Sequence, residues 1–262
     1  MPCTPRGYHR PGYHRPHHRR GQAAHQRLLC HPLRRRAAGA GVPAAGQLPA
    51  AAAAANRVIA ANRYQLNTSY GDNFLSNNDL LGNSPEDIFA IQVSSQSGIN
   101  QLNTFYSQYI RADREIQPQF ISLLDADDDR ANLYEDVGGT VYTNKYDVLY
   151  GNVKIMRLDE MYLIRAAASF RANTSTGAAP LDDINTIRER ALLPPLTTLT
   201  LADIPLELAF EGFRLGDLKR NQESTIDPLN GNAIPWNSPR LVFPIPLRET
   251  NVNSSLVQNT GY

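Results

Sequence analysis

Apolar and polar positions alternate most regularly between residues 153 and 194, where they predict two consecutive helices. In VKIMRLDEMYLIRAAASF, residues 153–170, apolar side chains recur at helical spacing at Ile155, Leu158, Tyr162 and Ala166. Arg157 and Glu160 are three residues apart, so we expect them to pair on the outer side of this helix. Residues 180–194, PLDDINTIRERALLP, repeat the pattern and end near Pro194. A polar loop joins the two segments, which predicts a helical hairpin.

A third helix is predicted within TLADIPLELAFEGFRLGDLKR, residues 200–220. Leu206, Phe210 and Phe213 follow one another at spacings of four and three, and would form its buried stripe. The final segment FPIPLRETNVNSSLVQNTGY, residues 243–262, is rich in Asn and Pro. It is too polar and too interrupted to predict a helix.

The first recognisable element is the alanine-rich stretch AAAAAANRVIAANRYQL, residues 50–66. Alanine is the best helix former, and Val58, Ile59 and Tyr64 supply larger apolar side chains. Such a helix needs a second helix against its small side chains, as in tetratricopeptide-type units. Residues 67–86 have the composition of a loop, and DIFAIQVSS, residues 87–95, alternates as a short strand does.

The acidic run DADDDR, residues 125–130, has the outline of a calcium-binding loop but fails the EF-hand pattern. Arg130 stands where glycine is required, and Asp136 stands where the pattern needs glutamate. We therefore expect a solvated turn and no metal site.

Charge divides the chain sharply. Residues 1–50 hold nine arginines and no acidic residue, whereas the rest holds 17 Lys and Arg against 25 Asp and Glu. Residues 1–50 have three interpretations. Their Cys and His could bind a metal, their arginines could bind nucleic acid, or the segment could be disordered. Arg, Ala, Gly and Pro have GC-rich codons, so a segment dominated by them can be a coding sequence translated in the wrong reading frame. When the codons of residues 33–48 are shifted by one base, the permitted translations include a helix-like sequence. We therefore expect residues 1–49 to be out of frame and unstructured, and residues 50–262 to form a domain incomplete at its N-terminal side.

Reactive chemistry is scarce after residue 50, because that part of the sequence contains neither His nor Cys. Disulfides and the usual nucleophile–base sets are therefore excluded there. Glu207, Glu211 and Asp217 could suggest a glycosidase, which needs two carboxylates facing a cleft. However, basic residues follow at helical spacing, namely Arg214, Lys219 and Arg220. Ion pairing is the simpler prediction, and no catalytic residue or cofactor is expected.

Several motifs in order resemble the SusD/RagB family. MRLDEMYLIRAAASF, INTIRERALL, LELAFEGFRLGDLKR and FPIPLRETNVNSSLVQNTGY are similar to its C-terminal series. NRVIAANRYQL, DIFAIQVS, the Asp-x-Arg of DDDR, and NKYD are similar to its middle part. The resemblance covers residues 50–262. It implies a mainly α fold of tetratricopeptide-like helical hairpins, of the α-solenoid type, with an irregular loop-rich insertion and minor β structure.

This resemblance also implies a function. Family members are non-catalytic outer-membrane lipoproteins that bind glycans or other nutrients at the cell surface and deliver them to a SusC-like TonB-dependent transporter. Neither a signal peptide nor a lipidation site is recognisable in residues 1–49. A protein-binding helical scaffold, a glycan-cleaving enzyme and a non-functional gene fragment remain alternatives.

Aromatic side chains stack on sugar rings, so the aromatic residues of the middle and C-terminal parts are the candidate ligand contacts. These candidates are Tyr106, Tyr109, Tyr142, Tyr146 and Trp236. A second set is expected to fix helix packing, namely Tyr162, Phe210, Glu211, Arg214 and Asp217. The expected partners are an oligosaccharide or other nutrient and the transporter, with no nucleic acid.

Overall fold

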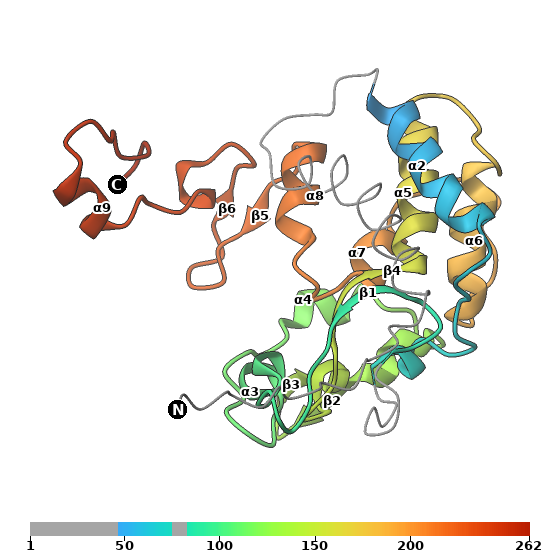
Figure 1. Cartoon of the computed structure of the whole chain (residues 1–262), viewed down its shortest axis with the longest axis horizontal. Coiled ribbons are helices and arrows are strands. Elements are labelled where there is room, and N and C mark those ends of the chain that lie inside the picture. Colours follow the sequence, from blue (N-terminus) through green and yellow to red (C-terminus); the bar gives the residue numbers. More distant parts are fainter. Residues whose placement is uncertain (1–46, 75–82) are drawn as a thin grey trace, which may run out of the picture.

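The structure, a computed structural model, describes residues 47–74 and 83–262 (Figure 1). Its helical body consists of α2 (Leu48–Ala60), α5 (Leu158–Arg171) and α6 (Pro180–Arg190), and α5 packs against both of the others. The prediction of a mainly helical fold with minor β structure is confirmed. The predicted frame shift and most of the predicted segment 1–49 lie outside the described residues.

Small side chains bring α2 and α5 together. On α2 the buried positions are Ala52, Ala54, Ala55 and Val58. They pack against α5, on which Ala166, Ala167 and Ala168 are buried as well. Apolar burial along this contact is the main force that holds a helix so poor in large side chains.

A second apolar cluster joins α5 to α6. Leu163 and Ala166 of α5 contact the fully buried Ile184 and Ile187 of α6, with Leu208 added from a later segment. The hairpin predicted from the helical periodicity is therefore confirmed.

The predicted first helix is wrong over its first five residues. Val153–Arg157 form strand β4, which pairs antiparallel with β1 (Asp87–Ile91), and the helix α5 begins only at Leu158. The buried face of β1 consists of Ile88 and Ala90. Arg157 is buried, so the predicted outward pair with Glu160 is also wrong.

The predicted third helix is two helices. α7 covers Asp203–Glu207 and α8 covers Arg214–Asn221. Between them Phe210 has φ +62° and Gly212 has φ +88°, a left-handed conformation that ends a helix. The carbonyls of Ala209 and Phe210 accept hydrogen bonds from Lys145 and Tyr146, which replace intrahelical donors.

The insertion between α2 and α5 is built of short elements (Figure 1). These are η2 (Gly71–Asn73), β1, α3 (Gln101–Tyr106), α4 (Pro118–Ile121), η3 (Asp129–Leu133), β2 (Tyr134–Val137), β3 (Thr140–Thr143), η4 (Asn144–Tyr146) and β4. Strands β2 and β3 form an antiparallel hairpin. The predicted solvated turn is only half correct, because Asp125 and Asp127 are exposed but Asp128 and Arg130 are buried.

The C-terminal segment leaves the helical body as an extended arm (Figure 1). It contains β5 (Thr225–Ile226), β6 (Ala233–Ile234), η5 (Pro239–Leu241) and α9 (Leu247–Val252). The prediction that residues 243–262 contain no helix is therefore wrong, since Pro246 opens the short helix α9. In the part of the chain that the structure describes, none of the helices combines the length and apolar character needed to cross a membrane.

Candidate functional site

Buried charged side chains join the insertion to the helices that follow it. Arg157, at the end of β4, lies 2.5 Å from Asp159 Oδ2 through Nη1 and 2.6 Å from Glu211 Oε1 through Nη2. Arg190, at the end of α6, pairs with both Glu86 and Glu207. Each of these side chains is at least nine-tenths buried, so the pairs are shielded from water and salt.

A third arginine extends this network into the acidic run. Arg130 is completely buried, and its Nη2 lies 2.8 Å from Asp128 Oδ2 and 3.0 Å from Asp203 Oδ1. Arg188 of α6 donates to the same Asp203, at 3.2 Å and 3.1 Å from its two carboxylate oxygens. The Asp-x-Arg motif is thus a structural connection between the insertion and α6 and α7.

The carboxylates of Glu207 and Glu211 both form ion pairs within this network. The prediction that they pair with following bases at i+3 spacing is wrong, because their partners come from distant segments. Only Asp217 pairs in that way, with Arg220. Burial alone would raise the pKa of Glu207, but the positive charges of Arg190 and Arg157 outweigh it and lower that pKa to about 2. Such a carboxylate holds no proton at neutral pH and is a poor general acid.

Lys145 carries the second connection. Its Nζ donates three hydrogen bonds, each 2.8 Å long, to Tyr70 Oη, the Ala209 carbonyl and Glu211 Oε1. Tyr70 Oη in turn donates to the Glu207 carbonyl at 2.5 Å. Burial lowers the pKa of Lys145, and Glu211 opposes that effect. With all three protons used, Lys145 has no donor left for a ligand.

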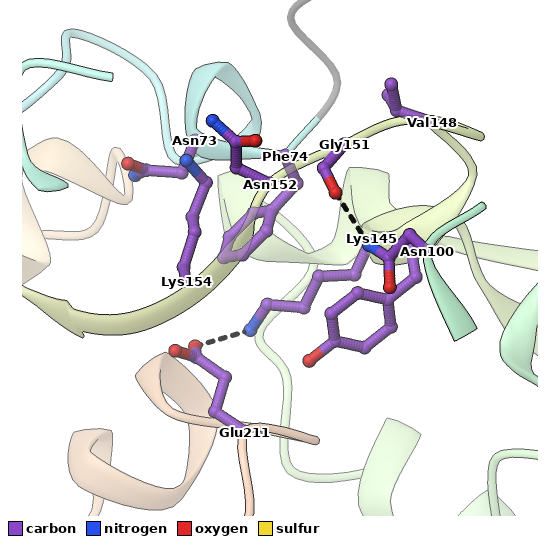
Figure 2. Close-up of a pocket in the computed structure, with 10 residues that line it drawn as sticks. Asn73, Phe74, Asn100, Lys145, Val148, Gly151, Asn152, Lys154 and Glu211 are labelled. Atoms are coloured by element: carbon purple, nitrogen blue, oxygen red, sulfur yellow. Dashed lines mark hydrogen bonds and ion pairs between the residues drawn. The ribbon is translucent and has the colours of Figure 1, made fainter. Parts of the chain in front are cut away.

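A small pocket lies beside this lysine (Figure 2). Its lining includes Phe74, Asn100, Asn152 and Lys154. Asn100 Nδ2 donates to the Gly151 carbonyl at 2.9 Å, and Lys154 Nζ lies 2.7 Å from Asp87 Oδ2. Asn152 Nδ2 donates to Asn83 and Gln92. Each of these polar side chains already bonds another group of the protein, which is typical of a packed interior and not of a ligand site.

The structure brings Tyr106 and Tyr146 together but places them in a packed aromatic cluster. Their ring centroids are 5.1 Å apart, and Phe210 lies 6.3 Å from Tyr106. Phe120 and Tyr134 complete the cluster around Phe210. Tyr146 Oη donates to the Phe210 carbonyl at 2.8 Å, and burial raises the pKa of Tyr146 well above its usual value.

The other three candidate contacts are more accessible. Tyr109 follows α3 and its side chain is 73% exposed. Tyr142 lies on β3 and is half-buried. Trp236, 36% exposed, lies just after β6 in the C-terminal arm. Ligand contact by each of the five residues stays a prediction.

The residues expected to fix helix packing take different positions. Tyr162 packs against both core clusters, and Phe210 and Glu211 lie in the break between α7 and α8. Arg214 is largely exposed and reaches Glu223 at 3.6 Å. Sequence reasoning missed the buried bases Arg130, Lys145, Arg157 and Arg190. All four lie in motifs that carried the family resemblance, namely DDDR, NKYD, MRLDEMYLIRAAASF and INTIRERALL, and this was the available signal.

Comparison with known proteins agrees with this architecture. The family model described as the SusD family matches residues 138–262. In these residues the chain is similar to the SusD family. The buried bases Lys145, Arg157 and Arg190 and the acids Asp159, Glu207 and Glu211 all fall within the matched SusD residues. No curated protein sequence matches the chain.

Solved SusD-type structures extend the likeness to most of the chain. A SusD superfamily protein from Parabacteroides distasonis is 20% identical with a TM-score of 0.66, and the match covers 92% of this chain and 63% of that one. Surface glycan-binding protein A from Bacteroides uniformis is 18% identical with a TM-score of 0.69, covering 82% and 57%. The Bacteroides thetaiotaomicron protein of that name, in complex with laminarihexaose, is 20% identical with a TM-score of 0.68, covering 82% and 60%. The chain spans about three fifths of the length of these structures.

Proposed function

We propose that this chain binds glycans without cleaving them, at the surface of the outer membrane, and delivers them to a SusC-like TonB-dependent transporter. The observation that carries the proposal is the shared fold with surface glycan-binding proteins, one of them in complex with laminarihexaose. The transporter and the location follow from the family resemblance, and they form the wider part of the proposal.

Two features of the described residues support a binding role without chemistry. Glu207 and Glu211, the carboxylates nearest to a glycosidase arrangement, are buried in ion pairs with Arg190 and Arg157. A glycosidase needs one carboxyl group that holds a proton and faces the sugar. In contrast, Tyr109 presents its ring to solvent, as a stacking contact for a sugar requires.

The direct test is a binding and turnover assay on one panel of hexasaccharides. Laminarin, cellulose, xylan, mannan and starch fragments are titrated against the full chain by calorimetry, and the same mixtures are assayed for new reducing ends. We expect saturable binding of at least one fragment and no cleavage. Turnover, or the absence of binding to every fragment, would overturn the proposal.

A protein-binding scaffold is the second candidate, and the C-terminal arm favours it. Leu229, Phe243 and Val257 of the arm are each at least 85% exposed, an unusual density of large apolar side chains. Affinity capture with the SusC-like transporter of the same organism separates the two candidates. If the chain is captured by the transporter but binds none of the saccharides in the panel, the protein-binding scaffold is favoured.

A further inference from the structure

The β2–β3 hairpin places a carboxylate beside a tyrosine on its outer face. In the antiparallel register Glu135 lies opposite Tyr142, and Tyr134 lies opposite Thr143. Thr143 is buried and Tyr134 packs against Phe120, so that pair faces the interior. Side chains alternate along a strand, and therefore Glu135 and Tyr142 share the face that points to solvent.

The segment that follows α3 joins this face through a direct hydrogen bond. Gln108 Nε2 donates to Glu135 Oε2 at 2.6 Å, and Asn144 Nδ2 donates to the same oxygen at 3.4 Å. Tyr109 is the next residue after Gln108. It is the most exposed of the four tyrosines that the sequence predicts as candidate ligand contacts. Glu135, Tyr142, Gln108 and Asn144 thus gather from β2, β3, the segment after α3 and η4, and Tyr109 follows Gln108 directly in the chain.

The loop that carries Tyr109 is held in place by its own bonds. Ala112 N donates to the Ser107 carbonyl at 3.1 Å, and Asp113 N donates to the Phe105 carbonyl at 3.0 Å. The Arg111 guanidinium lies 5.0 Å from the Phe105 ring centroid and pairs with Asp113 at 2.7 Å. Because the loop is already ordered, binding there costs little conformational entropy.

The charge of Glu135 decides which sugars fit. Its hydrogen bonds come from two neutral amides, and within residues 47–74 and 83–262 no ion pair neutralises it. An exposed carboxylate accepts sugar hydroxyls, but it repels the carboxylate of a uronic acid or a sulfate ester.

We infer that the Gln108–Tyr109 corner and the outer face of the β2–β3 hairpin form a saccharide site that selects neutral over acidic sugars. The inference rests on the proposed function. Tyr109 and Tyr142 supply the stacking surfaces, Glu135 accepts hydroxyl protons, and Gln108 and Asn144 hold that carboxylate in position.

The test compares one oligosaccharide in two forms, the neutral hexasaccharide of a six-carbon sugar that binds best in the panel and the same compound oxidised at C6 to the uronate. Tyr109→Ala weakens binding of the neutral form about tenfold, as expected for loss of a stacking contact. Wild type binds the uronate form at least tenfold more weakly than the neutral form at low salt, and Glu135→Gln reduces that ratio severalfold.

Phe170→Ala is the matched control, because Phe170 is a half-exposed aromatic residue on α5, outside this surface. It leaves both affinities unchanged. Tyr142 is half-buried, so Tyr142→Ala is interpreted only together with its thermal unfolding curve. If wild type binds neutral sugars but Tyr109→Ala and Glu135→Gln bind both forms as wild type does, the inference is overturned while the proposed function stands. If wild type binds no saccharide, both fail.

Discussion

Lys145 Nζ lies 2.8 Å from Glu211 Oε1, although 66 residues separate the two in the sequence. This contact ties the short helix η4 of the insertion to the break between α7 and α8. Arg157 holds the other side of the same carboxylate. The insertion that carries the tyrosines is therefore fixed to the helical body by charges in a dry interior.

Removing one partner of this buried pair should be costly. Lys145→Met leaves the Tyr70 hydroxyl and the Ala209 carbonyl without their donor and leaves Glu211 with Arg157 alone. We expect the free energy of unfolding to fall by about 3–5 kcal/mol, measured by urea denaturation. Arg248→Met, which breaks an exposed pair with Glu249, should cause no measurable change. Equal effects of the two substitutions would show that Lys145 is hydrated.

Glu207 and Asp159 should respond to pH in opposite directions. Glu207 titrates near 4.5 when unfolded and near 2 when folded, so its stabilising contribution is present above pH 4.5 and disappears as the pH falls toward 2. Burial raises the pKa of Asp159 well above 3.8 in the folded protein. Its ionisation therefore weakens the fold as the pH rises through that raised pKa.

Two substitutions separate these contributions in unfolding curves recorded from pH 2 to pH 8. The destabilisation caused by Glu207→Gln should be largest near neutral pH and should shrink below pH 4.5. Asp159→Asn should gain stability relative to wild type as the pH rises. Parallel curves for wild type and both variants would contradict this assignment.

Helical periodicity predicted α5 and α6, and alanine content predicted α2, because both signals are local properties of the sequence. The same rule failed at Val153–Arg157, where an apolar pattern fits both a helix and a strand. What decides the outcome is pairing with β1, and its partner residue for Arg157 is Asp87, 70 positions earlier. A local pattern contains no information on such a contact.

The candidate contacts show the same limit. Residue type and composition correctly indicated that tyrosines concentrate in the insertion. They could not separate Tyr146, which donates to a carbonyl 64 residues later, from the exposed Tyr109. The carboxylate of Glu135 was also missed, because its contact with Gln108 joins positions 27 residues apart in the sequence.

Gly177 offers a test of packing between distant segments. Its φ is +78°, and a Cβ atom there would lie 2.0 Å from Asn56 Oδ1, which accepts a hydrogen bond from Arg165. Gly212 has a similar φ of +88° but open space around a Cβ atom. Gly212→Ala should therefore cost about 1 kcal/mol of backbone strain, and Gly177→Ala about 2–4 kcal/mol, both measured by urea denaturation. Equal costs would mean that the Asn56 side chain moves aside freely.

The C-terminal arm should contribute little to the stability of the helical body. Phe243 is 90% exposed, whereas Met161 of α5 is fully buried in the cluster that joins α2 to α5. Met161→Ala removes buried apolar surface and should lower the free energy of unfolding by about 2–5 kcal/mol. Phe243→Ser should change it by less than about 0.5 kcal/mol, because its ring already meets water in the folded protein. A cost for Phe243→Ser similar to that for Met161→Ala would show that the arm folds back onto the body in solution, and would remove the apolar surface on which a protein partner depends.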